Sequence, residues 1–72
     1  MEKNKYYIDY LNSSGEVIEC HAALSLDDYA AIRTAFMYLP AGSPSFVISQ
    51  IENAYTIRPV VKVEITKTYY ED

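Results

Sequence analysis

The segment from Ser25 to Leu39 constrains the fold most, because it has helix signals at both ends and one apolar stripe at helical spacing. Ser25 is the predicted N-cap, and Asp28 follows three residues later in the capping-box position. Pro40 comes after the last turn, where proline cannot continue the hydrogen-bond ladder. The stripe comprises Tyr29, Ile32, Phe36 and Leu39. We therefore expect one helix that packs this stripe against the rest of the chain.

Two segments of alternating side chains precede this helix. Between Lys5 and Leu11 the alternation predicts a β-strand, with Tyr6, Ile8 and Tyr10 on one face. Between Glu16 and Ala23 a second strand is expected, with Ile18, Cys20 and Ala22 on one face and Val17, Glu19 and His21 on the other. Both strands are short and adjacent in the chain, so they predict a β-hairpin.

The hairpin loop fixes the expected register. A loop of Ser13, Ser14 and Gly15 places Gly15 at the left-handed position that glycine occupies without steric cost. Because residues opposite one another share a face, the apolar residues of the two strands should then face each other. The expected pairs are Tyr10 with Ile18, Ile8 with Cys20, and Tyr6 with Ala22. In this register Cys20 is a small buried hydrophobic residue under the helix.

Two more strands are expected after the helix. Residues from Phe46 to Ile51 are rich in β-branched side chains, and residues from Val60 to Tyr69 alternate. Glu52 and Asn53 are the predicted turn between them, with Tyr55 and Ile57 in a short strand that Pro59 restricts to a sheet edge or a bulge. A helix over residues 44–54, with Pro44 at its first position, is the alternative.

The fold class expected from these elements is α+β, a small antiparallel sheet in the order β-β-α-β-β with one helix packed on one face. The 72 residues suit a single domain, 1–72, with its core between about residues 5 and 70 and frayed termini. A chain of this length buries a modest core, so association with a second copy is one way to add stability.

Charge and composition restrict the class of partner. Six Lys and Arg against ten Asp and Glu give a net charge of -4, which argues against nucleic acid. A local basic patch of Arg58, Lys62 and Lys67 is the counter-hypothesis, with a solvated strand face preferred. We find no membrane-spanning stretch and no signal-peptide pattern, and the single cysteine fits a reducing compartment. The expected location is the cytoplasm.

No catalytic, cofactor or metal site is expected. Cys20 and His21 would form a nucleophile and base only on a shared face, whereas neighbours on a strand point to opposite faces. Asp27 and Asp28 lie where a helix start gives carboxylates a capping role. One histidine and one cysteine do not make a metal site, and the two glycines form no phosphate-binding loop.

Tyrosine is the unusual feature of the composition, with eight residues and no tryptophan. The tandem pairs Tyr6-Tyr7 and Tyr69-Tyr70 must each turn one ring away from the helix-covered face if they lie on strands. Tyrosine is enriched at protein interfaces, although it also suits an uncovered sheet face through β-propensity alone. Both interpretations stay open on the sequence.

The leading functional hypothesis is a non-catalytic protein-binding module that docks through its tyrosine-bearing sheet face or an exposed edge strand. Its acidity suits a basic partner surface. Small inhibitors that are carried by phages and mobile elements, and that occlude a host protein, offer an analogy. The alternative is a structural homo-oligomer, such as a dimer, while a small enzyme and a nucleic-acid binder rank lower. The candidate partner-binding residues are Tyr7, Tyr38, Tyr70, Glu19, Glu64, Glu71 and Asp72.

Overall fold

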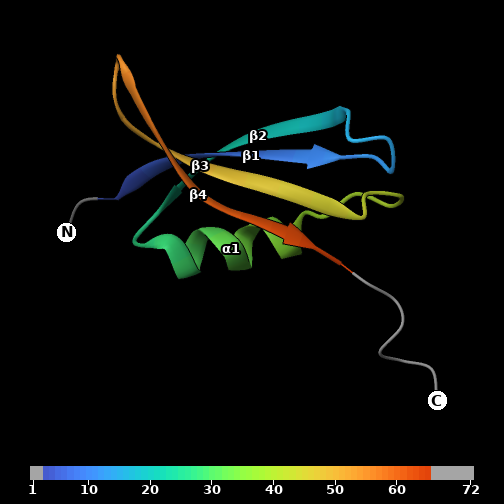
Figure 1. Cartoon of the computed structure of the whole chain (residues 1–72). Helices are drawn as coiled ribbons and strands as arrows, with labels where there is room; N and C mark the ends of the chain where they lie inside the picture. Colours follow the sequence, from blue (N-terminus) through green and yellow to red (C-terminus); the bar gives the residue numbers. More distant parts are fainter. Residues whose placement is uncertain (1–2, 66–72) are drawn as a thin grey trace.

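The computed structural model describes residues 3–65 and has the expected element order (Figure 1). Its elements are β1 (Asn4–Leu11), β2 (Val17–Ser25), α1 (Asp28–Met37), β3 (Ser45–Asn53) and β4 (Thr56–Glu64). The strands form one antiparallel sheet in the order β2-β1-β3-β4, so β1 and β3 are central and β2 and β4 are the edges. The predicted α+β class with the order β-β-α-β-β is confirmed.

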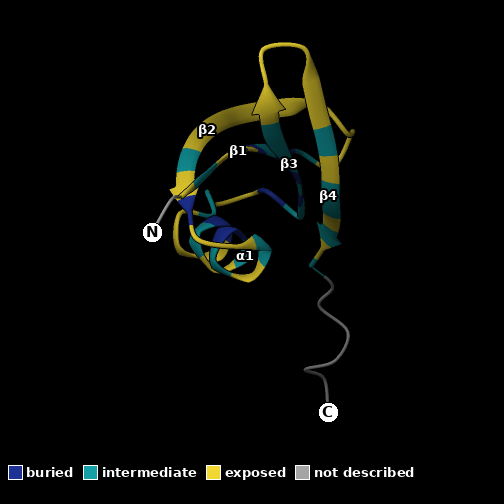
Figure 2. Cartoon of the chain, turned by 90° about the vertical axis from the view of Figure 1, so that its left-hand side faces the viewer, coloured by how far each residue is buried: buried dark blue, intermediate teal, exposed yellow. Residues whose placement is uncertain are grey.

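The helix lies against one face of the sheet (Figure 2). Large side chains on the central strands fill the space between the two layers, and small ones on α1 allow the helix to come close. Tyr6, Ile8 and Tyr10 of β1 are buried, as predicted, together with Phe46 and Ile48 of β3. The fully buried helix residues are Ala31 and Ala35. The Tyr10 hydroxyl spans the gap and donates a 2.6 Å hydrogen bond to the Ala35 carbonyl oxygen.

The helix is shorter than expected and begins at a different residue. Asp27, not Ser25, is the N-cap, and its Oδ1 accepts a 2.9 Å hydrogen bond from the Ala30 N–H. Ser25 is instead the last residue of β2, paired with Asn4, and this pairing keeps it extended. The capping role predicted for Asp27 is confirmed, and the predicted N-cap at Ser25 is wrong. The capping role predicted for Asp28 is also wrong, because its carboxylate accepts hydrogen bonds from Tyr6 and Arg58 instead.

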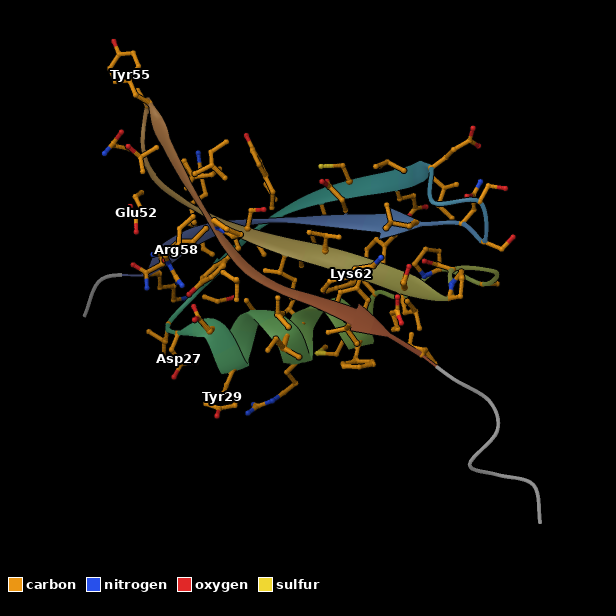
Figure 3. The ribbon with its side chains drawn as sticks, in the orientation of Figure 1. Asp27, Tyr29, Glu52, Tyr55, Arg58 and Lys62 are labelled. Carbon is orange, nitrogen blue, oxygen red and sulfur yellow. The ribbon has the colours of Figure 1, made fainter. Side chains whose placement is uncertain are left out.

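The predicted apolar stripe is also partly wrong. Ile32 and Leu39 pack against the core, but the face turned to the sheet is centred on Ala31 and Ala35. Tyr29 is 79% exposed and points away from the sheet (Figure 3). Phe36 lies at the margin, half exposed, with its ring edge against Phe46 at a centroid distance of 5.2 Å.

The hairpin register differs from the expected one because of a β-bulge. The loop itself is as predicted, with Gly15 at a φ of 87° and its N–H bonded to the Asn12 carbonyl. The bulge then adds Ile18 to β2 between the pairs Leu11–Val17 and Tyr10–Glu19. Every later pair is therefore shifted by one residue, so Ile8 lies opposite His21 and Tyr6 opposite Ala23. The expected pairs with Ile18, Cys20 and Ala22 are wrong, and Cys20 is exposed.

The second hairpin confirms the strand prediction for residues 46–51 and excludes the alternative helix over residues 44–54. β3 continues to Asn53, and the turn is formed by Ala54 and Tyr55 instead of the expected Glu52 and Asn53. β4 is an edge strand, and it passes through Pro59 next to a register shift, as the proline predicted. The expected strand from Val60 to Tyr69 is described only as far as Glu64, and Tyr69 lies outside the described residues.

Candidate functional site

The face of the sheet that α1 does not cover is the largest candidate surface, and we call it the open face. Within residues 3–65 no element packs on it (Figure 2). Strand alternation and the cross-strand pairs assign its members, since paired residues share a face. They are Lys5, Tyr7, Asp9, Leu11, Val17, Cys20, Ala22, Leu24, Ser45, Val47, Ser49, Ile51, Ile57, Pro59, Lys62 and Glu64.

Tyr7 lies at the centre of the open face. Its two direct neighbours across the sheet are Ala22 on β2 and Ser49 on β3, and Pro59 follows in the same row. Short side chains on both sides leave the larger ring standing above them, and Tyr7 is 40% exposed. A large apolar ring with a polar tip, surrounded by small residues, is typical of a residue that anchors a protein contact.

A mainly apolar row lies next to Tyr7 at the end of the sheet near the β3–β4 hairpin. Leu24, Lys5, Ile51 and Ile57 form one row across all four strands, and Leu24 and Ile57 are exposed. These residues were not among the predicted partner-binding residues. The sequence signal that could have found Ile51 is the apolar content of β3 on both faces, with Phe46 and Ile48 on one and Val47 and Ile51 on the other.

The open face carries balanced charge. Lys5 and Lys62 are its cations and Asp9 and Glu64 its anions, with Lys62 and Glu64 paired at 3.5 Å. Asp9 lies opposite Cys20, and the hydrogen bond from the thiol to this carboxylate, with partial burial, raises the pKa of Cys20. The open face is therefore close to neutral, and the excess negative charge of the chain lies outside it.

The predicted partner-binding residues do not form one surface. Tyr7 and Glu64 are on the open face, but Glu19 pairs with Tyr10 and so belongs to the helix-covered face. Tyr38 is the helix C-cap, 60% exposed, and its ring stacks on His21 at a centroid distance of 6.3 Å. Tyr70, Glu71 and Asp72 lie outside the described residues.

Cys20 and His21 point to opposite faces, as expected, but with their faces exchanged. The bulge turns Cys20 to the open face and His21 towards the helix. There the His21 Nε2 lies 3.1 Å from Glu19 Oε1, and the imidazole contacts the rings of Tyr10 and Tyr38. The thiol is beside a carboxylate, and its raised pKa opposes formation of the thiolate needed by a nucleophile.

A polar cluster joins the start of α1 to the sheet. Arg58 of β4 donates to Asp28 Oδ1 at 3.0 Å and to Gln50 Oε1 at 2.8 Å, and lies 3.6 Å from Glu52. Tyr6 donates to the same Asp28 oxygen at 2.8 Å. Because Arg58 is occupied by these acceptors and faces the helix, it does not join Lys62 in a basic patch (Figure 3). Lys67, the third member of that hypothesis, lies outside the described residues.

Two further properties of residues 3–65 concern metal ligands and membrane spans. No group of three or more potential metal ligands is found among these residues. Within the same range, no helix is long and apolar enough to cross a membrane.

The fold and the open face define a small α+β protein in which one helix covers one face of a four-stranded sheet. Comparison with known proteins finds no matching family model, no matching curated protein and no matching solved structure.

Proposed function

We propose that this protein is a non-catalytic protein-binding module that contacts its partner through the open face, with Tyr7 as the central anchor. The observation that carries the proposal is the exposed Tyr7 ring between Ala22 and Ser49 on an uncovered sheet. Four strands spaced by about 4.8 Å, each about 25–30 Å long, give a footprint of roughly 500 Å². Contact over this area buries about 1,000 Å² on both partners together, which reaches the lower limit of a specific interface.

The charge of the open face supports a partner surface that is mainly apolar. The net charge of -4 predicted a basic partner, but Lys5 and Lys62 balance Asp9 and Glu64 on this face. Occlusion of a protein by a small inhibitor is one action that such a module performs, and the small size of the chain is compatible with it. The proposal makes shape and apolar contact, more than net charge, the basis of recognition.

A matched pair of variants tests this function. Tyr7→Ser removes the central ring, whereas Tyr29→Ser removes an equally large exposed ring from the outer side of α1. Proteins captured from the source cell by the wild type should be lost with Tyr7→Ser and retained with Tyr29→Ser. Equal capture by both variants, with both shown to be folded by circular dichroism, would contradict the proposal.

A homodimer through the open face is the second candidate, and the balanced charge of this face favours it. A face with two cations and two anions meets its own copy without net repulsion, although the whole chain has a charge of -4. Sedimentation equilibrium at micromolar concentrations distinguishes the two candidates. A dimer that Tyr7→Ser dissociates would support self-association, and a monomer at all concentrations would exclude it.

A further inference from the structure

The two edges of the sheet differ in how they resist pairing with another strand. β4 contains Pro59, which lacks an N–H group, next to a register shift, and it carries Lys62. These features are among the devices that keep sheet edges from pairing. β2 has neither proline nor lysine, and its bulge lies near its start. From Glu19 to Ser25 it is a regular edge strand with no strand on its outer side among residues 3–65.

A groove runs beside this unprotected edge, between β2 and α1. It has a volume of about 360 Å³ and is lined by Ile8, Tyr10, His21, Ala23, Thr34 and Tyr38. Ala22 and Leu24 also line it, although strand alternation gives their side chains to the open face. Hence these two residues present the backbone edge of β2 to the groove. A strand-pairing edge and a hollow for side chains are thus adjacent.

We propose that an extended peptide segment of a partner protein adds to the edge of β2 and places an apolar side chain in this groove. This mode uses main-chain hydrogen bonds for affinity and pockets for alternate side chains for specificity. Ile8 and Tyr10 are buried beneath the groove, so an inserted side chain would pack against its accessible walls, chiefly Ala23 and the rings of His21 and Tyr38. The site is separate from the open face and does not depend on the function proposed for that face.

The charge beside the groove specifies a second feature of the peptide. Glu19 follows Ala23 and His21 on the groove side of β2, and its carboxylate is half exposed. In antiparallel pairing, an apolar residue opposite the small Ala23 is followed four positions later by the residue opposite Glu19. A lysine or arginine at that position pairs with the carboxylate. The expected ligand is therefore an extended segment with an apolar anchor and a basic residue four positions later.

A second copy of this chain does not satisfy the groove. Two β2 strands that share this edge are related by an axis perpendicular to the sheet, so the same face of each strand lies on the groove side. The partner's β2 would therefore present Glu19, His21 and Ala23 to the groove. These side chains are charged, already stacked on Tyr38, or too small to fill it. The groove favours a different sequence with a leucine or an aromatic residue as the anchor.

A synthetic peptide of alternating threonine and valine, with phenylalanine at one groove-facing position and lysine four residues later, is the probe. Fluorescence anisotropy should show binding that weakens by about tenfold or more with Tyr38→Ala. Tyr29→Ala, on the outer side of the same helix, and Tyr7→Ser, on the open face, should bind as the wild type. Amide hydrogen exchange should slow in residues 19–25 when the peptide is bound.

Two control peptides separate strand addition from simple apolar contact. Replacement of phenylalanine by alanine should remove the groove contact, and N-methylation of the amides that face β2 should remove the main-chain bonds. The proposal is overturned if Tyr38→Ala and both control peptides leave the affinity unchanged. If the peptide protected Cys20 from alkylation but did not slow amide exchange in residues 19–25, the peptide would be assigned to the open face. If these amides were protected from exchange without peptide, and the protection increased with protein concentration, the edge would be assigned to a second copy of the chain.

Discussion

The Tyr6 hydroxyl donates a 2.8 Å hydrogen bond to Oδ1 of Asp28, which joins the covered face of β1 to the first turn of α1. Arg58 donates to the same oxygen at 3.0 Å from the edge strand β4. One carboxylate thus connects the helix to two strands of the sheet. The bond from Tyr6 and then the charge and hydrogen bond of Arg58 lower the pKa of Asp28, and partial burial acts in the opposite direction.

Acid should weaken the fold through Asp28. Because its pKa is lower in the folded than in the unfolded chain, its contribution is present above the unfolded value, about 3.9, and is lost as the pH falls through the folded value. Asp28→Asn should therefore reduce the pH dependence of unfolding between about pH 5 and pH 2. At neutral pH it should cost about 1 kcal/mol, a modest figure because the carboxylate is 43% exposed. Urea unfolding at several pH values measures both effects.

Asp27→Asn is the matched control for this experiment. Asp27 caps the helix through its bond from the Ala30 N–H, and asparagine caps a helix nearly as well as aspartate. This variant should keep the neutral stability of the wild type, whereas Asp28→Asn should lose about 1 kcal/mol. If Asp27→Asn lost as much neutral stability as Asp28→Asn, the loss in Asp28→Asn would not be specific to its contacts with Tyr6 and Arg58.

Alkali should weaken the fold through two buried tyrosines. Burial is the main cause that raises the pKa of both Tyr6 and Tyr10, with Asp28 adding to the first and Glu19 to the second. A group with a raised folded pKa stabilises the fold below its unfolded value, about 10, and loses this contribution as the pH rises through the folded value. Absorbance titration should show these two phenols ionising last, together with unfolding. Tyr10→Phe should reduce the late step from two phenols to one, that of Tyr6, and cost about 1 kcal/mol through the lost bond to Ala35.

Cys20 should react slowly but completely with iodoacetamide in the native protein. The side chain is exposed on the open face, so no unfolding is required. Its pKa is raised by the hydrogen bond to Asp9, so little thiolate is present at neutral pH. Asp9→Asn should accelerate the reaction at pH 7.5 by several-fold. Alkylation that required denaturant would show that Cys20 is buried after all.

Gly15→Ala should destabilise the β1–β2 hairpin. Gly15 has a φ of 87°, in the left-handed region, and a Cβ there meets no atom within 4 Å. The cost is therefore backbone strain alone, about 1–2 kcal/mol. Gly15→Asn should cost less, because asparagine adopts this conformation more readily than alanine. Chemical denaturation compares the two variants, and equal stability of alanine and glycine would exclude the strain.

Alternation predicted the faces of β1 correctly. Tyr6, Ile8 and Tyr10 are buried while Tyr7 faces away from the helix, because β1 is central and has one face against α1. A one-residue slip in the register of such a strand would move its apolar side chains to the wrong face and destabilise the fold, so its alternation predicts the faces reliably. The same alternation predicted that Tyr7 lies on the face away from the helix. The positions of Tyr38 and Glu19 could not be predicted in this way, because they depend on the end of the helix and on the register of β2.

The sequence by itself determined the order of the elements, the presence of a single helix, the Gly15 turn and the opposite faces of Tyr6 and Tyr7. Only the tertiary structure decided which side of β2 faces the helix, through one extra residue at Ile18. The physical reason is that β2 is an edge strand, exposed on both faces over most of its length, so burial selects neither side of its pattern. The bulge placed Cys20 on the open face and His21 beside Tyr38 in the groove.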